Sequence, residues 1–166
     1  MTGDVVLSVD VATQPIRSRA VPKFVATDVN DIVHTVVGCG RSYLSRKTAL
    51  TLEMCCGPQR ILGNQERLTD VLFALLFRAE RSIAIAARTT GAICIRTWAT
   101  DGEVRLSLSS NGFDTSIGDT GGTDRCLSLT ECAEIISDHG GRVYSWRPCA
   151  GGATYTIVLH VIQSQS

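Results

Sequence analysis

The segment over residues 64–87 constrains the fold of this chain more than any other. Its apolar residues recur at spacings of three and four, which places them on one face of an α-helix, and neither proline nor glycine interrupts it. These residues are Leu68, Val71, Leu72, Leu75, Leu76, Ala79, Ile83 and Ala86. A helix of this length must bury its apolar face, so we expect it to pack against a sheet.

Alternating apolar and polar residues on both sides of this helix predict the strands of that sheet. The predicted strands span residues 50–54, 60–62, 93–95, 104–108, 143–146 and 154–161. The first two are interpreted as a strand pair joined by a turn at Gly57-Pro58. Asp101-Gly102 makes the next two a hairpin, and Gly151-Gly152 lies between the last two.

Capping signals predict two further helices. Asp28 can cap the first, with Asp31 at its third helical position, and Ser128 with Glu131 forms a capping box for the second. The expected apolar positions are Val29, Ile32, Val33, Val36 and Val37 in the first helix, and Cys132, Ile135, Ile136 and, at the edge, His139 in the second. Gly140-Gly141 ends the second helix.

Together these segments predict an α+β fold. It is a two-layer α/β sandwich in which a mixed, mostly antiparallel sheet carries about three helices on one face. We expect one domain over residues 24–162, because 166 residues suit a single core. Residues 1–23 hold two prolines and are expected to form an arm or short extra strand, and residues 163–166 a tail. The glycine-rich stretch over 113–125 is predicted to be a loop.

Composition excludes several classes of function. The formal net charge is zero, so nothing favours nucleic acid as a partner. No apolar run suits a membrane segment and no secretory signal precedes the domain, so a cytoplasmic location is expected. The seven cysteines are odd in number and lack zinc spacing. We therefore expect reduced thiols that mostly fill the core, and no metal site.

The order and punctuation of these segments resemble the ATP-binding domain of sensor histidine kinases. That domain belongs to the GHKL superfamily, together with gyrase-type ATPases, heat-shock chaperones and the serine kinases that act as anti-sigma factors. "GNQERLTDVLFALLFRAERSI" resembles the asparagine-box helix of the family, and "GAICIRTWATDGEVRLSLSSNG" resembles the hairpin leading to its first glycine box. "LSLTECAEIISDHGGRVYSWRPCAGGATYTIVLHV" resembles the following helix, the His-Gly-Gly turn and the terminal strands.

The resemblance implies a nucleotide site whose chemistry this sequence changes. The two asparagines of the family's helix, the second of which holds Mg²⁺, correspond to Ala74 and Arg78. A guanidinium has no lone pair to offer a metal and repels one. The adenine-reading aspartate corresponds to Ser110, which can accept a hydrogen bond but without charge assistance. A glycine near the phosphates corresponds to Asp114, whose carboxylate would repel them.

The second glycine box also departs from the family. Its two key glycines correspond to Cys126 and Ser128, although backbone close to phosphate favours glycine. The glycines kept at turns are Gly112, Gly121, Gly122, Gly140 and Gly141. The first three and Thr154 in the last strand are candidate nucleotide-site residues. The segments that define the family's fold are kept, and the residues expected to contact the nucleotide are changed.

Three hypotheses follow. The leading one is a degenerate, non-catalytic binding module in two-component or phosphorelay signalling, with no cofactor. Its protein partner would be a response regulator, a phosphotransfer protein or another kinase, and a homodimer is compatible with it. The alternative is a kinase of histidine or serine that binds ATP or ADP, with or without Mg²⁺, where Arg78 replaces the metal. The third is an anti-sigma-like module that grips its partner by the same surface.

Several residues keep two interpretations. Arg78 is either a phosphate ligand or a surface arginine paired with a carboxylate such as Glu80 or Asp114. Ser110 and Asn111 either touch a base or are a strand end entering a turn.

The histidines and one cysteine are equally open. His34, His139 and His160 are either phosphorylation sites or structural and surface residues. Cys126 is either a redox-active thiol near a helix N-terminus or an ordinary cysteine.

Overall fold

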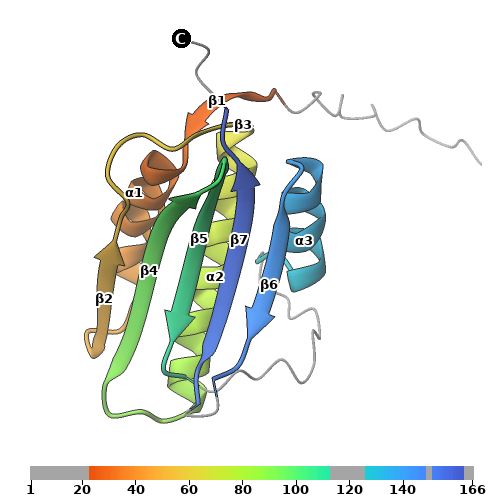
Figure 1. The fold of residues 1–166 in the computed structure, drawn as a ribbon. Coiled ribbons are helices and arrows are strands. Elements are labelled where there is room, and N and C mark those ends of the chain that lie inside the picture. Colours follow the sequence, from red (N-terminus) through yellow and green to blue (C-terminus); the bar gives the residue numbers. More distant parts are fainter. Residues whose placement is uncertain (1–22, 113–125, 149–150, 163–166) are drawn as a thin grey trace, which may run out of the picture.

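A five-stranded sheet with helices on one face forms the body of the computed structural model, which describes residues 23–112, 126–148 and 151–162 (Figure 1). The strand order is β2-β4-β5-β7-β6. The strands are β2 (Thr48–Glu53), β4 (Gly91–Thr100), β5 (Glu103–Ser110), β6 (Arg142–Trp146) and β7 (Ala153–His160). Only β2 and β4 pair in parallel, and the other pairs are antiparallel. The two-layer α+β sandwich with a mixed sheet is confirmed.

One predicted pairing was wrong. The strand around residues 60–62, now β3 (Arg60–Gly63), does not pair with the preceding strand β2. It pairs antiparallel with β1 (Val25–Asp28) in a separate two-stranded sheet, and Ile61 also bridges to Val161. The neighbour of β2 in the main sheet is β4. The chain leaves that sheet between β2 and β3.

The predicted long helix is confirmed as α2 (Gln65–Ile85), which lies between the other two helices behind the sheet (Figure 1). Asn64 caps it by accepting a hydrogen bond from the backbone N–H of Arg67 at 3.0 Å. The seven apolar residues predicted within its bounds are buried, and Ala86 is the C-cap. Because this face packs on the inward side chains of β4, β5 and β7, α2 is the centre of the core.

The flanking helices begin where the caps predicted. Asp28 caps α1 (Val29–Gly40) by accepting from the N–H of Asn30 at 2.9 Å, and Ser128 caps α3 (Leu129–Asp138) in a complete capping box. A 3-10 turn, η1 (Arg41–Tyr43), follows α1. The β4–β5 turn at Asp101-Gly102 has φ of 48° and 79°, the left-handed pair that a tight hairpin requires.

The cysteines depart from their predicted role. Six lie in the described residues and form no disulfide with one another, but only Cys132 is buried in the core. The others lie at the ends of elements, in turns or on the uncovered sheet face, where few apolar neighbours surround them. They are Cys39, Cys55, Cys56, Cys94 and Cys126.

Some predictions fall outside the described residues. These are the arm over residues 1–22 and the loop over 113–125 with its candidates Asp114, Gly121 and Gly122. Within the described part of the chain, no helix combines the length and the apolar content needed to cross a bilayer.

Candidate functional site

The end of β5 lies directly on the backbone of α2. A Cβ placed on Gly112 would lie 2.5 Å from the carbonyl carbon of Ser82, and closer still to Ser82 Oγ and to the backbone N of Ile83. No side chain fits such a space, so the glycine allows the strand end and the helix to touch. Gly112 therefore holds the frame of the site in place.

Ser110 is engaged with the same helix. Its Oγ lies 3.4 Å from the Oγ of Ser82, which itself donates to the backbone carbonyl of Ala79 at 2.7 Å. Since the Ser82 proton is committed to that carbonyl, the Ser110 hydroxyl is the donor in the serine pair. Ser82 is only 5% exposed. The residue at the adenine-reading position thus makes a contact within the protein.

Asn111 serves the sheet. Its Oδ1 accepts from the backbone N–H of Ala92 at 2.8 Å, and its Nδ2 donates to the carbonyl of Thr90 at 3.1 Å. Both ends of the amide are used to hold the strand end of β5 against the start of β4. The interpretation of Asn111 as part of a strand end entering a turn is the one this geometry favours.

The two asparagine-box positions lie on α2, one turn apart. Ala74 is 2% exposed, and the Sγ of Cys126 lies 4.0 Å from its backbone carbonyl oxygen. Arg78 is partly exposed. Alanine offers no side-chain donor atom and arginine offers only N–H donors. These two side chains do not fit a Mg²⁺ ion.

Ser128 and Thr154 have roles other than the contact of Ser110 and Gly112 with α2. Ser128 Oγ accepts from the N–H of Glu131 at 3.1 Å, and its own N–H donates to Glu131 Oε2 at 2.7 Å. That backbone hydrogen bond lowers the pKa of Glu131. Thr154 is paired with Ser109 on β5, which faces away from α2. The structure therefore places Thr154 on the uncovered face of the sheet.

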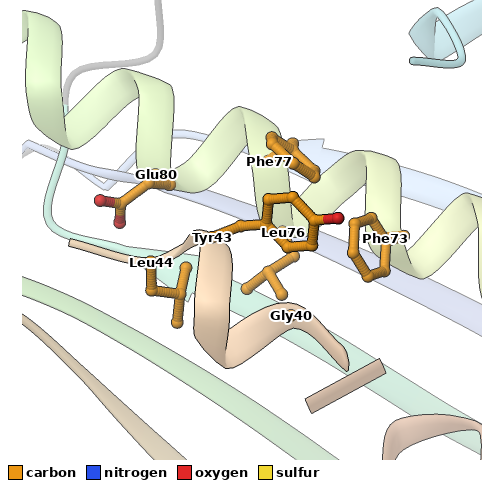
Figure 2. Close-up of a pocket in the computed structure, with 7 residues that line it drawn as sticks. All are labelled: Gly40, Tyr43, Leu44, Phe73, Leu76, Phe77 and Glu80. Carbon is orange, nitrogen blue, oxygen red and sulfur yellow. The ribbon is translucent and has the colours of Figure 1, made fainter. Parts of the chain in front are cut away.

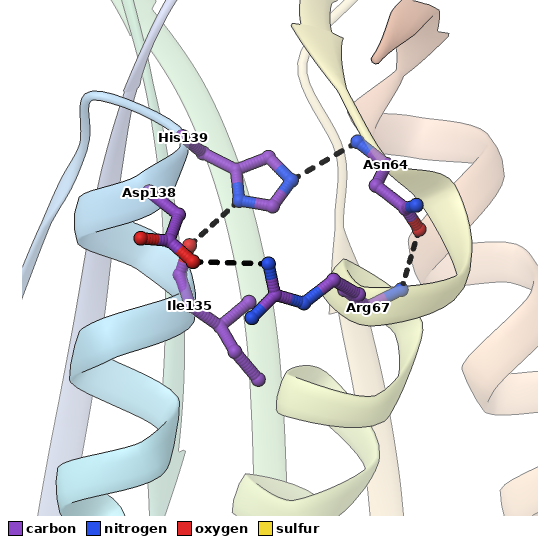
Figure 3. A network of polar contacts seen from close by, with 5 residues as sticks. All are labelled: Asn64, Arg67, Ile135, Asp138 and His139. Atoms are coloured by element: carbon purple, nitrogen blue, oxygen red, sulfur yellow. Dashed lines mark hydrogen bonds and ion pairs between the residues drawn. The ribbon is translucent and has the colours of Figure 1, made fainter. Parts of the chain in front are cut away.

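A second cluster of polar contacts joins the N-terminus of α2 to the C-terminus of α3 (Figure 3). The backbone N–H of Asn64 donates to His139 Nε2 at 3.0 Å, so the proton is on Nδ1, which lies 2.6 Å from the carbonyl oxygen of Ile135. Beside it, Arg67 forms an ion pair with Asp138 at 3.0 Å. His139 thus has a structural role that the His-Gly-Gly spacing alone did not reveal.

Sites for metals are not apparent in the described ranges. No group of three or more His, Cys, Asp and Glu side chains there is arranged to hold an ion.

The comparisons with known proteins rest on structure. No protein-family model matches the sequence, and no curated protein matches it. Solved structures do. The catalytic domain of the histidine kinase ThkA is 19% identical, with a TM-score of 0.68 over 85% of this chain and 99% of that one. The mycobacterial sensor histidine kinase MprB is 18% identical, with a TM-score of 0.66 over 85% and 99%.

The similarity extends to a kinase domain solved by NMR. The histidine kinase domain of the E. coli osmosensor EnvZ is 13% identical, with a TM-score of 0.65 over 90% of this chain and 95% of that one. All three likenesses cover nearly the whole length of the compared domain, which confirms the resemblance seen in the sequence. This chain has the fold of the ATP-binding catalytic domain of histidine kinases.

Proposed function

We propose that this domain is a degenerate histidine-kinase-type ATPase domain that acts as a non-catalytic binding module in two-component or phosphorelay signalling. The fold supports the signalling class, and the residues at the nucleotide positions support the loss of catalysis. Neither Ala74 nor Arg78 can ligate Mg²⁺. Without a metal, the charge that develops on a transferring phosphoryl group lacks its usual stabilisation.

The contact between Ser110 and Ser82 carries the proposal. In a working site, the side chain at position 110 would point at the exocyclic amine of adenine. Here its hydroxyl is 3.4 Å from Ser82 Oγ, against the buried face of α2. To read a base, the Ser110 oxygen would have to accept from the amine while its proton stays on Ser82, in a contact without charge assistance that offers little binding energy.

A response regulator, a phosphotransfer protein or another kinase is the proposed partner. One similar structure is that of the histidine kinase ThkA in complex with the response regulator TrrA, in which this chain covers 42% of the matched chain. The kinase fold therefore occurs in a protein that binds a response regulator. A domain that keeps the fold and lacks the catalytic side chains could retain such binding.

Isothermal titration with a non-hydrolysable ATP analogue, with and without Mg²⁺, tests the proposal. We expect no heat of binding at about millimolar nucleotide in either condition, a limit near 4 kcal/mol of binding free energy. Micromolar binding that depends on Mg²⁺ would contradict it. Binding without Mg²⁺ that is lost in Arg78→Ala and kept in the control Arg81→Ala would instead establish the alternative of a metal-independent nucleotide site.

A further inference from the structure

Three aromatic rings from two separate elements gather on the outer surface of the helix layer (Figure 2). Tyr43 in η1 contacts Phe73 and Phe77 of α2, with ring centroids 5.7 Å and 5.3 Å apart, and the two phenylalanines are 5.3 Å from each other. Tyr43 is 61% exposed and Phe77 38%. Phe73 packs partly against the core, whereas Tyr43 and Phe77 are exposed, and exposed apolar clusters of this kind commonly mark interaction sites.

The two phenylalanines belong to a regular stripe along α2. Its members recur at alternating spacings of four and three, the period of a seam between two helices. They are Glu66, Asp70, Phe73, Phe77, Glu80 and Ala84, and all six are exposed or only partly buried. The stripe is roughly 27 Å long at about 1.5 Å per residue. The opposite face of α2 is the one that packs on the sheet.

The apolar centre of the stripe is hollowed. A cavity of about 10 Å³ lies between Gly40, Tyr43, Leu44, Phe73, Leu76, Phe77 and Glu80 (Figure 2). Gly40 packs closely on α2 at the wall of this cavity, because a Cβ there would lie 2.6 Å from Leu76 Cδ2. The volume suits one group about the size of a water molecule or methyl. An apolar side chain from another molecule could therefore insert its tip between the rings.

Carboxylates flank this apolar centre. Glu66 and Asp70 lie one turn apart on the stripe. The pKa of Asp70 is raised, mainly by partial burial and to a smaller extent by repulsion from Glu66. No ion pair involves either residue within the described part of the chain. On the other side, Glu80 Oε1 accepts from the N–H of Ser45 at 2.8 Å, and its Oε2 is buried without a hydrogen-bond partner among the described residues. The stripe is therefore apolar in the middle and negative at the end that holds Glu66 and Asp70.

We propose that this stripe binds a basic amphipathic α-helix of a protein partner. The heptad spacing fits a helix laid along α2, since side chains at that period interdigitate with those of a second helix. An apolar side chain of the partner fills the hollow between Tyr43, Phe73 and Phe77. Lysine or arginine side chains of the partner pair with the exposed carboxylates of Glu66 and Asp70. The inference rests on the proposed function in that it assigns a docking surface to a binding module.

Two synthetic helical peptides of about 18 residues, long enough to span the stripe, test this surface. Both carry the same leucines at heptad spacing, and the flanking positions are lysine in one and glutamate in the other. NMR titration of ¹⁵N-labelled full-length protein gives the dissociation constant and the location of binding. We expect the lysine peptide to bind at least about tenfold more tightly and to shift resonances of α2 and η1.

Substitutions on the stripe distinguish specific binding of the peptide there from non-specific electrostatic attraction. Phe77→Ser and, independently, Tyr43→Ser should each weaken binding of the lysine peptide about tenfold, because each removes a wall of the hollow. The double variant Glu66→Lys/Asp70→Lys should reverse the preference between the two peptides. Tyr144→Ser is the matched control, since Tyr144 is an equally exposed aromatic residue (52%) on β6, and it should leave binding unchanged.

Other outcomes overturn the proposal. Equal binding of both peptides, or no shift of α2 resonances at about 1 mM peptide, would show that the stripe does not select a basic helix. A concentration-dependent dimer that is lost in Phe77→Ser would assign the surface to self-association instead. These results are independent of the nucleotide titration: nucleotide binding would contradict the non-catalytic role and leave the peptide measurements standing.

Discussion

The two ends of α2 use their polar groups for different purposes. At the N-terminus, Asn64 and Arg67 bond to His139 and Asp138 of α3, so the contacts join two helices. In the middle and the C-terminal half, the positions that the resemblance aligns with the asparagine box are Ala74 and Arg78, and Ser82 bonds to the serine at the end of β5. The polar contacts at one end join two helices, and those at the other join the helix to the sheet.

This difference shows that the frame of such a domain and its chemistry can vary separately. Gly112 keeps β5 on α2 whether or not a ligand is present, because its requirement is steric and lies within the protein. The positions of Ala74 and Ser110 each accommodate a side chain, so neither needs a glycine. A retained fold is therefore weak evidence for retained activity.

The largest expected effect is that of Gly112→Ala, at the end of α2 that meets β5. Its Cβ would meet the backbone of Ser82 and Ile83, which cannot move without disturbing α2. We expect the free energy of unfolding to fall by about 3 kcal/mol, the upper part of the range for overpacking. Urea denaturation followed by circular dichroism measures this loss.

Gly38→Ala is the matched control for that glycine. Gly38 lies in α1, and a Cβ there would meet no atom within 4 Å. Alanine favours the helix, so the same substitution should raise the free energy of unfolding by about 0.5–1 kcal/mol. Equal effects of both substitutions would show that Gly112 is not a close contact.

At the other end of α2, His139→Ala should have the second largest effect. It removes the acceptor of the Asn64 N–H, a 2.6 Å contact with the Ile135 carbonyl, and a ring contact with Phe24 at 4.7 Å. We expect a loss of about 2 kcal/mol in the free energy of unfolding. His34→Ala, on the exposed side of α1, should change it by less than about 0.5 kcal/mol. A similar loss in both would mean that the junction does not depend on His139.

Ser110→Ala addresses the serine pair that replaces the base contact. Removing its hydroxyl should lower the free energy of unfolding by about 1 kcal/mol, the value of one hydrogen bond. In a double-mutant cycle with Ser82→Ala, the two losses should not add, because both remove the same interaction. Additive losses would show that Ser110 is not bonded to Ser82 in solution, and would weaken the case for a non-catalytic site.

Periodicity and capping predicted the fold well where one element carries its own signal. The buried face of α2, the caps at Asp28 and Ser128, and the Asp101-Gly102 turn were all legible in the sequence. The β1–β3 sheet was not, because a four-residue strand is too short to show alternation, and its pairing depends on distant residues. The parallel partner of β2 could not be predicted for the same reason.

The candidate site was predictable in outline only. Gly112 and Ser110 were singled out by resemblance, but their contacts involve Ser82, a buried polar residue that the helical pattern does not distinguish. The aromatic cluster also escaped prediction. Phe73 and Phe77 lie off the apolar face, and their partner Tyr43 comes from another element. The spacing of residues within one element does not reveal which residues of another element they contact.

The smallest expected effect is that of Asp70→Asn. Asp70 lies on the outer stripe of α2 and makes none of the contacts at the two ends of that helix. Partial burial and the neighbouring Glu66 raise the pKa of Asp70, so the folded protein binds this proton more tightly than the unfolded chain does. Stability therefore falls as pH rises from the ordinary value of 3.8 through the raised pKa, and Asp70→Asn should remove that loss. We expect a gain of about 0.3 kcal/mol near pH 7, shrinking in high salt.

Urea titrations of Asp70→Asn and the parent near pH 7 and near pH 4 measure the difference, which should narrow at the lower pH. Glu131→Gln should instead lower the free energy of unfolding near pH 7. The hydrogen bond from Ser128 lowers the pKa of Glu131, so the charge of this carboxylate stabilises the folded state above the ordinary value of 4.5. If Asp70→Asn destabilised the protein at neutral pH, Asp70 would have a stabilising partner within the fold. A gain would instead mean that the charge on this stripe costs stability, as expected for a surface that meets its complement on another molecule.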